Sequence, residues 1–529
     1  MLKIYRRGLA TSAAALVSAA ALVVSGIAGA YNAPPAENMP ASSGLIITKL
    51  KQPDEVGSSA TGLPIAGNLP SEVIPGVKFS AYLVPIMHDP MSQLGQNEIA
   101  STTLAEARAL AANRPVDRMG ITDSDGQIHW QTDAPPEKRD GANLQNGLWL
   151  IRESATPPGV VSAGDFLVSV PLTNPIARDA WLDTIYVYPK NHTVTGVKSV
   201  ENAAELVVGG TVTWTLTLDN PSPRDHITGD YVATDGFAVF DWFDAGLLDT
   251  AADGSDVHVV SPAGLVRGQD YLVEVGRNQN NATITIDFSS LALEKFAAAP
   301  TDDVRVTVDT VVVGQGKIEN NATFSSSILQ PYGTPIEPAE VRYGGYALHK
   351  KSDASSSEGP VDLSGAEFMV FGDVDEAVAA AGGTQAARDA ALKPAVTAPG
   401  YDPDTGVWTT NQSGRVDISG LRYSDFADGV VVGPDDPRYQ SYWLVETKAL
   451  ANHQLLVSPI EFVVTEGSLV QNTETIVNRY NRGGFLLPLT GGLGTILFTV
   501  GGLALVATVL IVARRRRQQP DAVAEQQAI

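Results

Sequence analysis

The chain has 529 residues, enough for about three to four domains of roughly 100–200 residues each. Its 59 acidic and 36 basic side chains give a net charge of −23, which argues against a surface that binds nucleic-acid phosphates. The absence of cysteine excludes disulfides and thiolate chemistry. The 33 prolines and 49 glycines favour short strands and many turns over long helices.

The first 30 residues have the pattern of a secretory signal. They begin with three basic side chains, continue with an apolar stretch at 13–27 and end in the small residues Ala28–Ala30. We therefore predict that 1–30 is a signal peptide, cleaved before Tyr31. An N-terminal anchor helix fits less well, because the apolar run is short and an Ala-x-Ala site follows it.

Three β-rich blocks follow the signal. The first, 31–190, carries strand-like alternation that is interrupted at 103–113 by a helical period, which predicts a β-sandwich with a helical insertion. The second, 191–340, has strand signals at 211–218, 271–275, 282–288 and 304–313. The third, 341–481, opens with a strand at 346–350 and has a helix-prone stretch at 375–392. Strands at this spacing predict tandem immunoglobulin-like sandwiches.

The C-terminal end has three successive features. An uncharged stretch of 21 residues, 493–513, would span about 31 Å as a helix and so predicts a transmembrane segment. The basic tail 514–529 after it is expected to stay in the cytoplasm. The pentapeptide just before the span is made of Leu487, Pro488, Leu489, Thr490 and Gly491.

This three-part order resembles the cell-wall sorting signal of Gram-positive surface proteins. In that family a sortase cysteine cuts between Thr and Gly and passes the Thr carbonyl to an amine, which implies Thr490 as the acyl donor here. Losing both ends removes seven basic but only two acidic side chains, so the ectodomain is more acidic than the whole chain. Such a charge keeps an exposed protein soluble.

The most informative internal segment is 181–191, with the sequence WLDTIYVYPKN. Alternation places Trp181, Ile185 and Val187 on one strand face and Lys190 on the other. Taken alone, this pattern describes an edge strand with a solvated lysine. The stretch nevertheless resembles the pilin motif WxxxVxVYPK of sortase-assembled major pilins of the SpaA and FimA types, with Ile185 in place of Val.

The resemblance implies a transpeptidation between identical subunits. A class C sortase would hold Thr490 of one subunit as a thioester, and the Lys190 amine of the next would attack it to give an intermolecular amide. Because an attacking amine must be uncharged, we expect Lys190 to lie where burial or the docked enzyme lowers its pKa.

A second resemblance concerns the third block. The segment 442–449, YWLVETKA, resembles the E-box of the same pilins, whose domains are of the collagen-adhesin B type (CnaB-like). It departs from that pattern at Leu450, Asn452 and His453. The resemblance implies that Lys350 attacks the Asn478 carboxamide with loss of ammonia, while Glu446 transfers the proton.

Two alternatives remain for this third block. Lys351 replaces Lys350 as the nucleophile if the strand register slips by one residue. A buried Lys–Glu salt bridge, or simply solvent-facing side chains, would leave no covalent bond.

The second block also offers a lysine, an acidic residue and an asparagine, with an aspartate in place of the glutamate. The family patterns KxV, DxxxxGL and IxNxA select Lys198, Asp241 and Asn320, with Asn321 as an alternative to Asn320. The resemblance thus implies a second internal isopeptide bond, with Asp241 as its catalytic carboxyl.

The first block has only look-alikes of these residues. Lys49 and Glu153 occur in suitable strands, but we find no final-strand asparagine to complete the set and therefore predict no internal bond there. Turns at Asp123–Gly126 and Asp402–Gly406 lack the length and terminal glutamate of a calcium loop. We expect no metal and no cofactor, because no zinc-ligand spacing and no hydrolase or phosphate-loop motif occurs.

These observations lead to one overall interpretation. The fold is predicted to be mainly β, with tandem CnaB-like sandwiches, small helical insertions and one C-terminal transmembrane helix. The chain resembles a major shaft pilin, a non-enzymatic structural subunit that is exported, wall-anchored and supports adhesion. A monomeric wall-anchored adhesin is the alternative, and a hydrolase fits less well because no converging catalytic site can be placed.

The resemblance also implies partners. They are a class C pilin sortase, a housekeeping sortase, identical subunits, peptidoglycan, tip or minor pilins, and host or bacterial receptors of unknown identity.

Overall fold

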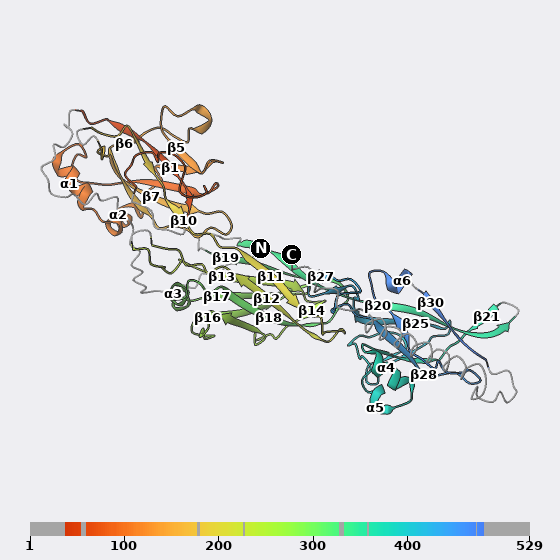
Figure 1. Ribbon diagram of the computed structural model, residues 1–529. Coiled ribbons are helices and arrows are strands. Elements are labelled where there is room, and N and C mark those ends of the chain that lie inside the picture. Colours follow the sequence, from red (N-terminus) through yellow and green to blue (C-terminus); the bar gives the residue numbers. More distant parts are fainter. Residues whose placement is uncertain are drawn as a thin grey trace, which may run out of the picture.

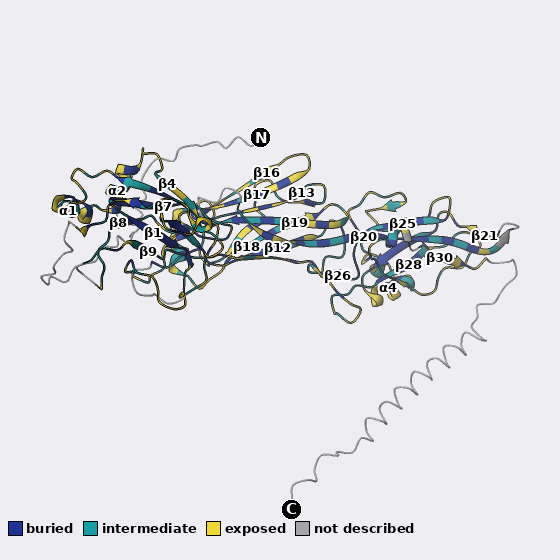
Figure 2. Cartoon of the chain, turned by 90° about the horizontal axis from the view of Figure 1, so that it is seen from above, coloured by how far each residue is buried: buried dark blue, intermediate teal, exposed yellow. Residues whose placement is uncertain are grey.

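The structure, a computed structural model, describes residues 38–480 apart from 54–59, 177–179, 226–227, 327–332, 357–358 and 472. These residues form three β-rich units in a row, D1 (38–191), D2 (192–343) and D3 (344–480), which together make an elongated rod (Figure 1). Buried side chains follow the strands of each unit and form a separate main core in each (Figure 2).

Several predicted segments fall outside this part of the chain. The signal peptide 1–30, the sorting motif 487–491, the span 493–513 and the tail 514–529 all lie outside the described residues. Within the residues that are described, no helix is long and apolar enough to cross a membrane.

D1 is a sandwich of two sheets with helices inserted between β3 and β4, as predicted. One sheet has the order β4-β3-β7-β8, and in the other β1 pairs with β5, β6 and β9. Strand β9 runs parallel to β1, and β10 continues this arrangement by pairing in parallel with β2. The elements are β1 (Ser42–Thr48), β2 (Leu50–Lys51), β3 (Lys78–Val84), α1 (Gln93–Ser101), α2 (Leu104–Ala111), β4 (Arg118–Ile121), β5 (Gln127–Trp130), the 3₁₀ helix Pro136–Lys138, β6 (Leu144–Gln145), β7 (Gly147–Ala155), β8 (Phe166–Val170), β9 (Thr184–Val187) and β10 (Lys190–Asn191).

D2 is also a two-sheet sandwich, and its four predicted strands appear as β12, β16, β17 and β18. In β12 the apolar residues Val212, Trp214 and Leu216 are buried, and the threonines between them point away from the core. The elements are β11 (Gly196–Glu201), β12 (Thr211–Leu218), β13 (Ala238–Asp244), β14 (Leu248–Asp249), β15 (Val257–Ser261), β16 (Tyr271–Arg277), β17 (Asn281–Phe288), α3 (Ser290–Ala298), β18 (Val304–Val312), β19 (Gly316–Ser325) and β20 (Thr334–Ser356).

D3 packs the C-terminal half of β20, with β25, β30 and β21, against the sheet β23-β24-β22-β28-β29. The helical stretch predicted at 375–392 forms two short helices, because Gly382 and Gly383 follow α4 and Gly383 has a φ of +85°. The elements are β21 (Gly359–Asp362), β22 (Glu367–Phe371), α4 (Val374–Ala381), α5 (Gln385–Arg388), β23 (Tyr401–Asp402), β24 (Val407–Thr409), β25 (Arg415–Arg422), β26 (Phe426–Ala427), β27 (Val430–Val431), β28 (Tyr442–Lys448), β29 (Ile460–Phe462), α6 (Ser468–Gln471) and β30 (Thr473–Asn478).

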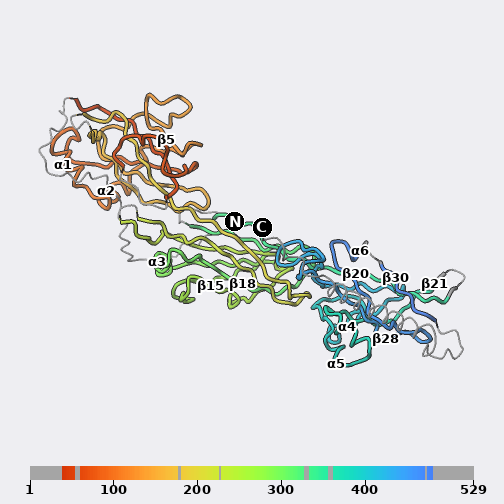
Figure 3. Tube along the Cα trace, in the orientation of Figure 1, coloured from red at the N-terminus to blue at the C-terminus, as the bar shows by residue number. Residues whose placement is uncertain are grey.

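One strand joins D2 to D3. β20 pairs antiparallel with β19 through residues 334–343. Through residues 343–352 it then pairs antiparallel with β25 and parallel with β30. The predicted boundary at 340/341 therefore falls inside a continuous strand, which can be followed along the trace in Figure 3. D2 and D3 share backbone hydrogen bonds rather than meeting through a loop.

Candidate cross-linking sites

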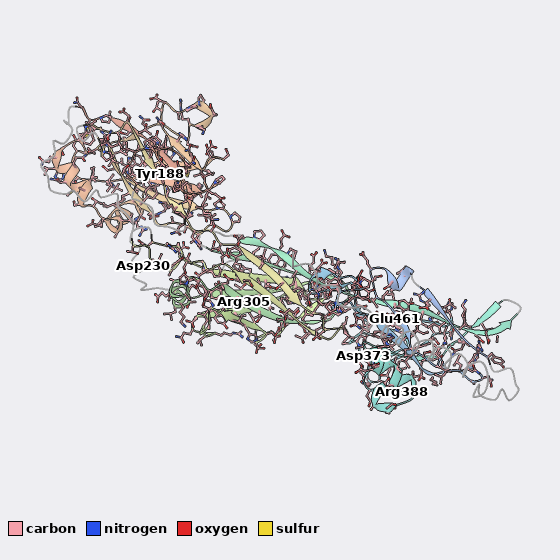
Figure 4. All side chains as sticks on the ribbon, viewed as in Figure 1. Tyr188, Asp230, Arg305, Asp373, Arg388 and Glu461 are labelled. Atoms are coloured by element: carbon pink, nitrogen blue, oxygen red, sulfur yellow. The ribbon has the colours of Figure 1, made fainter. Side chains whose placement is uncertain are left out.

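Lys190 lies where D1 ends. Strand β9 buries Ile185 and Val187, and the chain then passes through Tyr188, which Figure 4 labels, and Pro189 into β10. The Lys190 side chain is half-buried, and this burial lowers the pKa of its amine. Lys190 thus has the kind of environment that the chemistry requires of an attacking amine.

D3 brings Lys350, Glu446 and Asn478 together in its core. Lys350 Nζ donates to Asn478 Oδ1 at 2.5 Å and lies 3.3 Å from Glu446 Oε1, while Asn478 Nδ2 donates to Glu446 Oε1 at 2.8 Å. All three residues are at most 3% exposed. Burial lowers the pKa of Lys350, and the negative charge of Glu446 opposes this change.

The register of β20 favours Lys350 over Lys351. Lys351 is only partly buried and its Nζ lies 3.9 Å from Asp362 on β21, away from the core. Asn452, where the E-box departs from the family, adopts a φ of +64°, a conformation that asparagine tolerates better than most residues. The loop that follows returns to the site, and the Leu456 N–H donates to Glu446 Oε2 at 3.0 Å.

D2 brings Lys198 and Asp241 into contact. Lys198 Nζ donates to Asp241 Oδ2 at 2.5 Å, and both side chains are fully buried. Burial lowers the pKa of Lys198 and raises the pKa of Asp241. Both changes favour the uncharged forms that an amine nucleophile and a proton donor need.

Asn320 rather than Asn321 points into the D2 core. Asn320 is 0% exposed, whereas Asn321 is partly exposed on the other face of β19. The Asn320 side chain lies close enough to Asp241 to oppose the rise in its pKa. Neither of its polar atoms, however, makes a well-formed hydrogen bond within the described chain. Such a buried amide is costly unless something else satisfies it.

D1 corrects one prediction, because an asparagine does complete a third set of groups. Lys49 Nζ contacts Glu153 Oε1, and Asn191 Nδ2 donates to Glu153 Oε2 at 3.0 Å. All three residues are at most 4% exposed. The asparagine directly follows Lys190, and Lys49 lies between β1 and β2, in alternation with the buried residues Leu45 and Ile47.

The two acidic turns bond to their own backbone. Asp123 Oδ1 accepts from the N–H groups of Asp125 and Gln127, both at 2.9 Å. Asp402 accepts from the Asp404 N–H at 3.1 Å. In the part of the chain that the structure describes, no group of three His, Asp or Glu side chains is placed to hold a metal ion. These contacts agree with the turn interpretation of both segments.

Comparison with known proteins gives the context for these sites. A family model described as the Gram-positive pilin subunit D1, N-terminal domain, matches residues 45–192. The type 1 fimbrial subunit of Actinomyces viscosus is 27% identical over 411 residues, which cover 72% of this chain and 74% of the relative. The type 2 fimbrial subunit of Actinomyces naeslundii is 26% identical over 429 residues, covering 76% and 74%.

Solved structures show the same fold. The full-length major pilin SpaD from Corynebacterium diphtheriae has a TM-score of 0.55 and 21% identity, over 84% of this chain and 98% of that one. The major pilin SpaA from the same organism has a TM-score of 0.56 and 19% identity, over 83% and 100%.

Residues 45–192 thus match the family model of a Gram-positive pilin domain, and the described chain has the same fold as SpaD and SpaA. Over about three quarters of its length, the chain is similar in sequence to two fimbrial subunits.

Proposed function

We propose that this protein is the shaft subunit of a covalent pilus, joined head to tail by an amide between Lys190 of one subunit and Thr490 of the next. The observation that carries the proposal is the placement of Lys190. It lies at the end of D1, on a strand held by β2, with an amine whose pKa is lowered by burial. A class C sortase would supply the acyl donor as a Thr490 thioester, and a housekeeping sortase would attach the completed polymer to peptidoglycan.

Two internal isopeptide bonds belong to the same proposal. Lys350 would attack the Asn478 carboxamide with Glu446 transferring the proton, and Lys198 would attack Asn320 with Asp241 in that role. Ammonia leaves in each case. The D2 bond would join β11 to β19, and the D3 bond would join β20 to β30. The solved SpaA structure is described as having stabilising isopeptide bonds, which supports this chemistry in a protein of the same fold.

Lys190→Ala tests the polymer directly. Wall extracts of cells with the unchanged protein should give a ladder of high-mass species on denaturing gels, and the variant should give only the monomer. Lys51→Ala is a matched control, because Lys51 pairs with Asn191 next to Lys190 but is exposed, and it should keep the ladder. In the linked fibres, mass spectrometry should find a peptide that joins Lys190 to Thr490.

The same gel distinguishes the proposed pilus subunit from the alternative function. A monomeric wall-anchored adhesin would give one band in the unchanged protein as well as in Lys190→Ala. A ladder that persists in Lys190→Ala would show that another lysine makes the link.

A further inference from the structure

The loop 450–456, which follows β28, contacts all three strands that carry the reactive groups of D3. At its end, the Leu456 N–H donates to Oε2 of Glu446 on β28 at 3.0 Å. In its middle, His453 forms a β-bridge with Tyr480, just beyond the end of β30, and its side chain reaches β20. The loop also contains the three positions at which the chain departs from the E-box pattern. The same loop therefore braces the strands of the carboxyl, the carboxamide and the lysine.

The His453 ring is held in one tautomer. Its Nδ1 lies 3.0 Å from Ala451 O, which can only accept a hydrogen bond, so we assign the proton to Nδ1. In the neutral ring Nε2 is then an acceptor, and it lies 2.9 Å from Ser352 Oγ. The Ser352 hydroxyl therefore donates to His453.

Ser352 depends on this acceptor because it is only 1% exposed. It lies two residues beyond Lys350 on β20, so both side chains point into the core, and its backbone pairs with that of Asn478. The Ala354 N–H donates to Ser352 Oγ at 3.0 Å, which leaves the hydroxyl hydrogen to be satisfied by His453. Loss of the ring would deprive a buried hydroxyl next to Asn478 of its acceptor, which is costly.

His453 also holds the chain just beyond Asn478. Asn478 is the last residue of β30, and the ladder with β20 ends there. The rings of His453 and Tyr480 meet edge to face, with centroids 5.3 Å apart. The Gln454 N–H donates to Arg479 O at 3.0 Å. These contacts fix a strand end that would otherwise be free to fray.

We propose that His453 is a positioning residue for the bond between Lys350 and Asn478, a role that rests on the proposed function. His453 acts through Ser352 and Tyr480, which keep the end of β30 in register with β20. In the reaction, Lys350 Nζ bonds to Asn478 Cγ, the bond from Cγ to Nδ2 breaks, and a proton passes through the carboxyl group to the ammonia that leaves. A displacement of about 1 Å can slow such a reaction by roughly 100-fold.

The time course of bond formation tests this role. The full chain is made by cell-free synthesis and quenched in acidic denaturant at set times. Peptide mapping then gives the fraction in which Lys350 is linked to Asn478, about 17 Da lighter by loss of ammonia. His453→Ala should slow this linkage by roughly 10- to 100-fold. The D2 linkage of Lys198 to Asn320, read in the same samples, should keep its rate.

Two further variants separate the hydrogen bond from the packing. His453→Gln keeps an acceptor for the Ser352 hydroxyl and should restore most of the rate. His453→Phe keeps a ring against Tyr480 but has no acceptor, so it should link as slowly as His453→Ala. Gln454→Ala is the matched control, because its side chain is exposed while its backbone bond to Arg479 remains, and it should link at the unchanged rate.

The outcomes distinguish this role from the bond itself. The comparison of His453→Gln with His453→Phe stands even if His453→Ala does not fold. Equal D3 rates in His453→Phe and the unchanged protein would overturn the role of His453 and leave the bond standing. Equal slowing of D2 and D3 would show a general folding defect and would overturn it too. A D3 that stays unlinked in the folded, unchanged protein would remove the bond and this role together.

Discussion

At the scale of single residues, burial separates the reactive side chains from their neighbours in sequence. The sequence offers two identical neighbours at each of two positions, Lys350 with Lys351 and Asn320 with Asn321. Only the strand register decides which member of each pair enters the core. The structure turns Lys350 and Asn320 inward. The grouping of Asn191 with Glu153 and Lys49 depends on the pairing of β2 with β10, which is not visible in a linear pattern.

The pair Asn320 and Asn321 offers a matched test of the D2 bond. Asn320→Ala should remove one loss of about 17 Da from the intact mass, because no carboxamide then faces Lys198. Asn321→Ala should keep that loss, because its side chain lies on the outer face of β19. Intact-mass measurement of both variants checks the expectation, and the reverse result would assign the bond to Asn321.

The lowered pKa of Lys190 predicts a specific pH dependence. Pulse acetylation at a series of pH values should show Lys190 becoming reactive at lower pH in the folded protein than in the same chain in denaturant. Between the pKa of Lys190 in the folded chain and its higher pKa in the unfolded chain, the unfolded state binds more protons. The burial of Lys190 therefore lowers the free energy of unfolding at low pH, and this destabilisation disappears as pH rises. Equal midpoints in the folded and denatured chains would show that burial does not change this pKa.

At the scale of elements, strands with clean alternation were predictable, but one long strand was not. β12 has the predicted bounds because apolar residues and threonines alternate along all of it. The boundary predicted at 340/341 divides β20, because the prolines at 331, 335 and 338 are typical of a linker. In the structure Pro335 pairs with Thr323, and Pro338 lies where the register between β19 and β20 shifts. A proline is tolerated where the ladder needs no N–H from it.

Short helices were also harder to predict than strands. α2 was expected and begins after Thr103, whose side chain and that of Glu106 form a capping box. α3 was not expected, although Ser289 caps it by accepting from the Ala292 N–H. Its nine residues are too few to give a strong helical period among so many strands.

The bulge between β20 and β25 predicts a steric effect at Gly345. A Cβ atom there would lie 2.1 Å from the Ile418 carbonyl oxygen, so Gly345→Ala must displace the backbone of β25. We expect a loss of about 1–3 kcal/mol in the free energy of unfolding, seen as a lower midpoint of thermal unfolding by circular dichroism. Gly433→Ala is the control, because nothing lies within 4 Å of the Cβ position. Equal midpoints for both variants would contradict the packing at this bulge.

At the scale of the whole molecule, the proposed bonds define a short route for tension. A pull on Lys190 would follow the backbone to Lys198, cross to Asn320, follow the chain to Lys350 and cross to Asn478. The loops of D2 and D3 between each bonded pair would be bypassed. The loaded segment between the two bonds would include the first half of β20, where β19 holds it by antiparallel pairing.

The two joints of the rod are built differently. D2 and D3 share β20, and Asn202 of D2 and Asp428 of D3 also form two reciprocal hydrogen bonds. The Asp428 N–H donates to Asn202 Oδ1 at 2.7 Å, and the Asn202 N–H donates to Asp428 Oδ1 at 2.8 Å. D1 and D2 instead share a short backbone bridge, Val160–Thr193, and a reciprocal pair of hydrogen bonds between the Gln52 side chain and the Arg224 backbone, at 2.8 and 3.1 Å.

The continuous strand has a consequence for the stiffness of the subunit. Bending between D2 and D3 would require the β20 ladder to shear, whereas the backbone pairing between D1 and D2 in the described residues is limited to the isolated bridge Val160–Thr193 and the hydrogen bonds around it. Within one subunit, D2 and D3 should therefore move as a single stiff unit, and the D1–D2 joint should bend more easily than the D2–D3 joint.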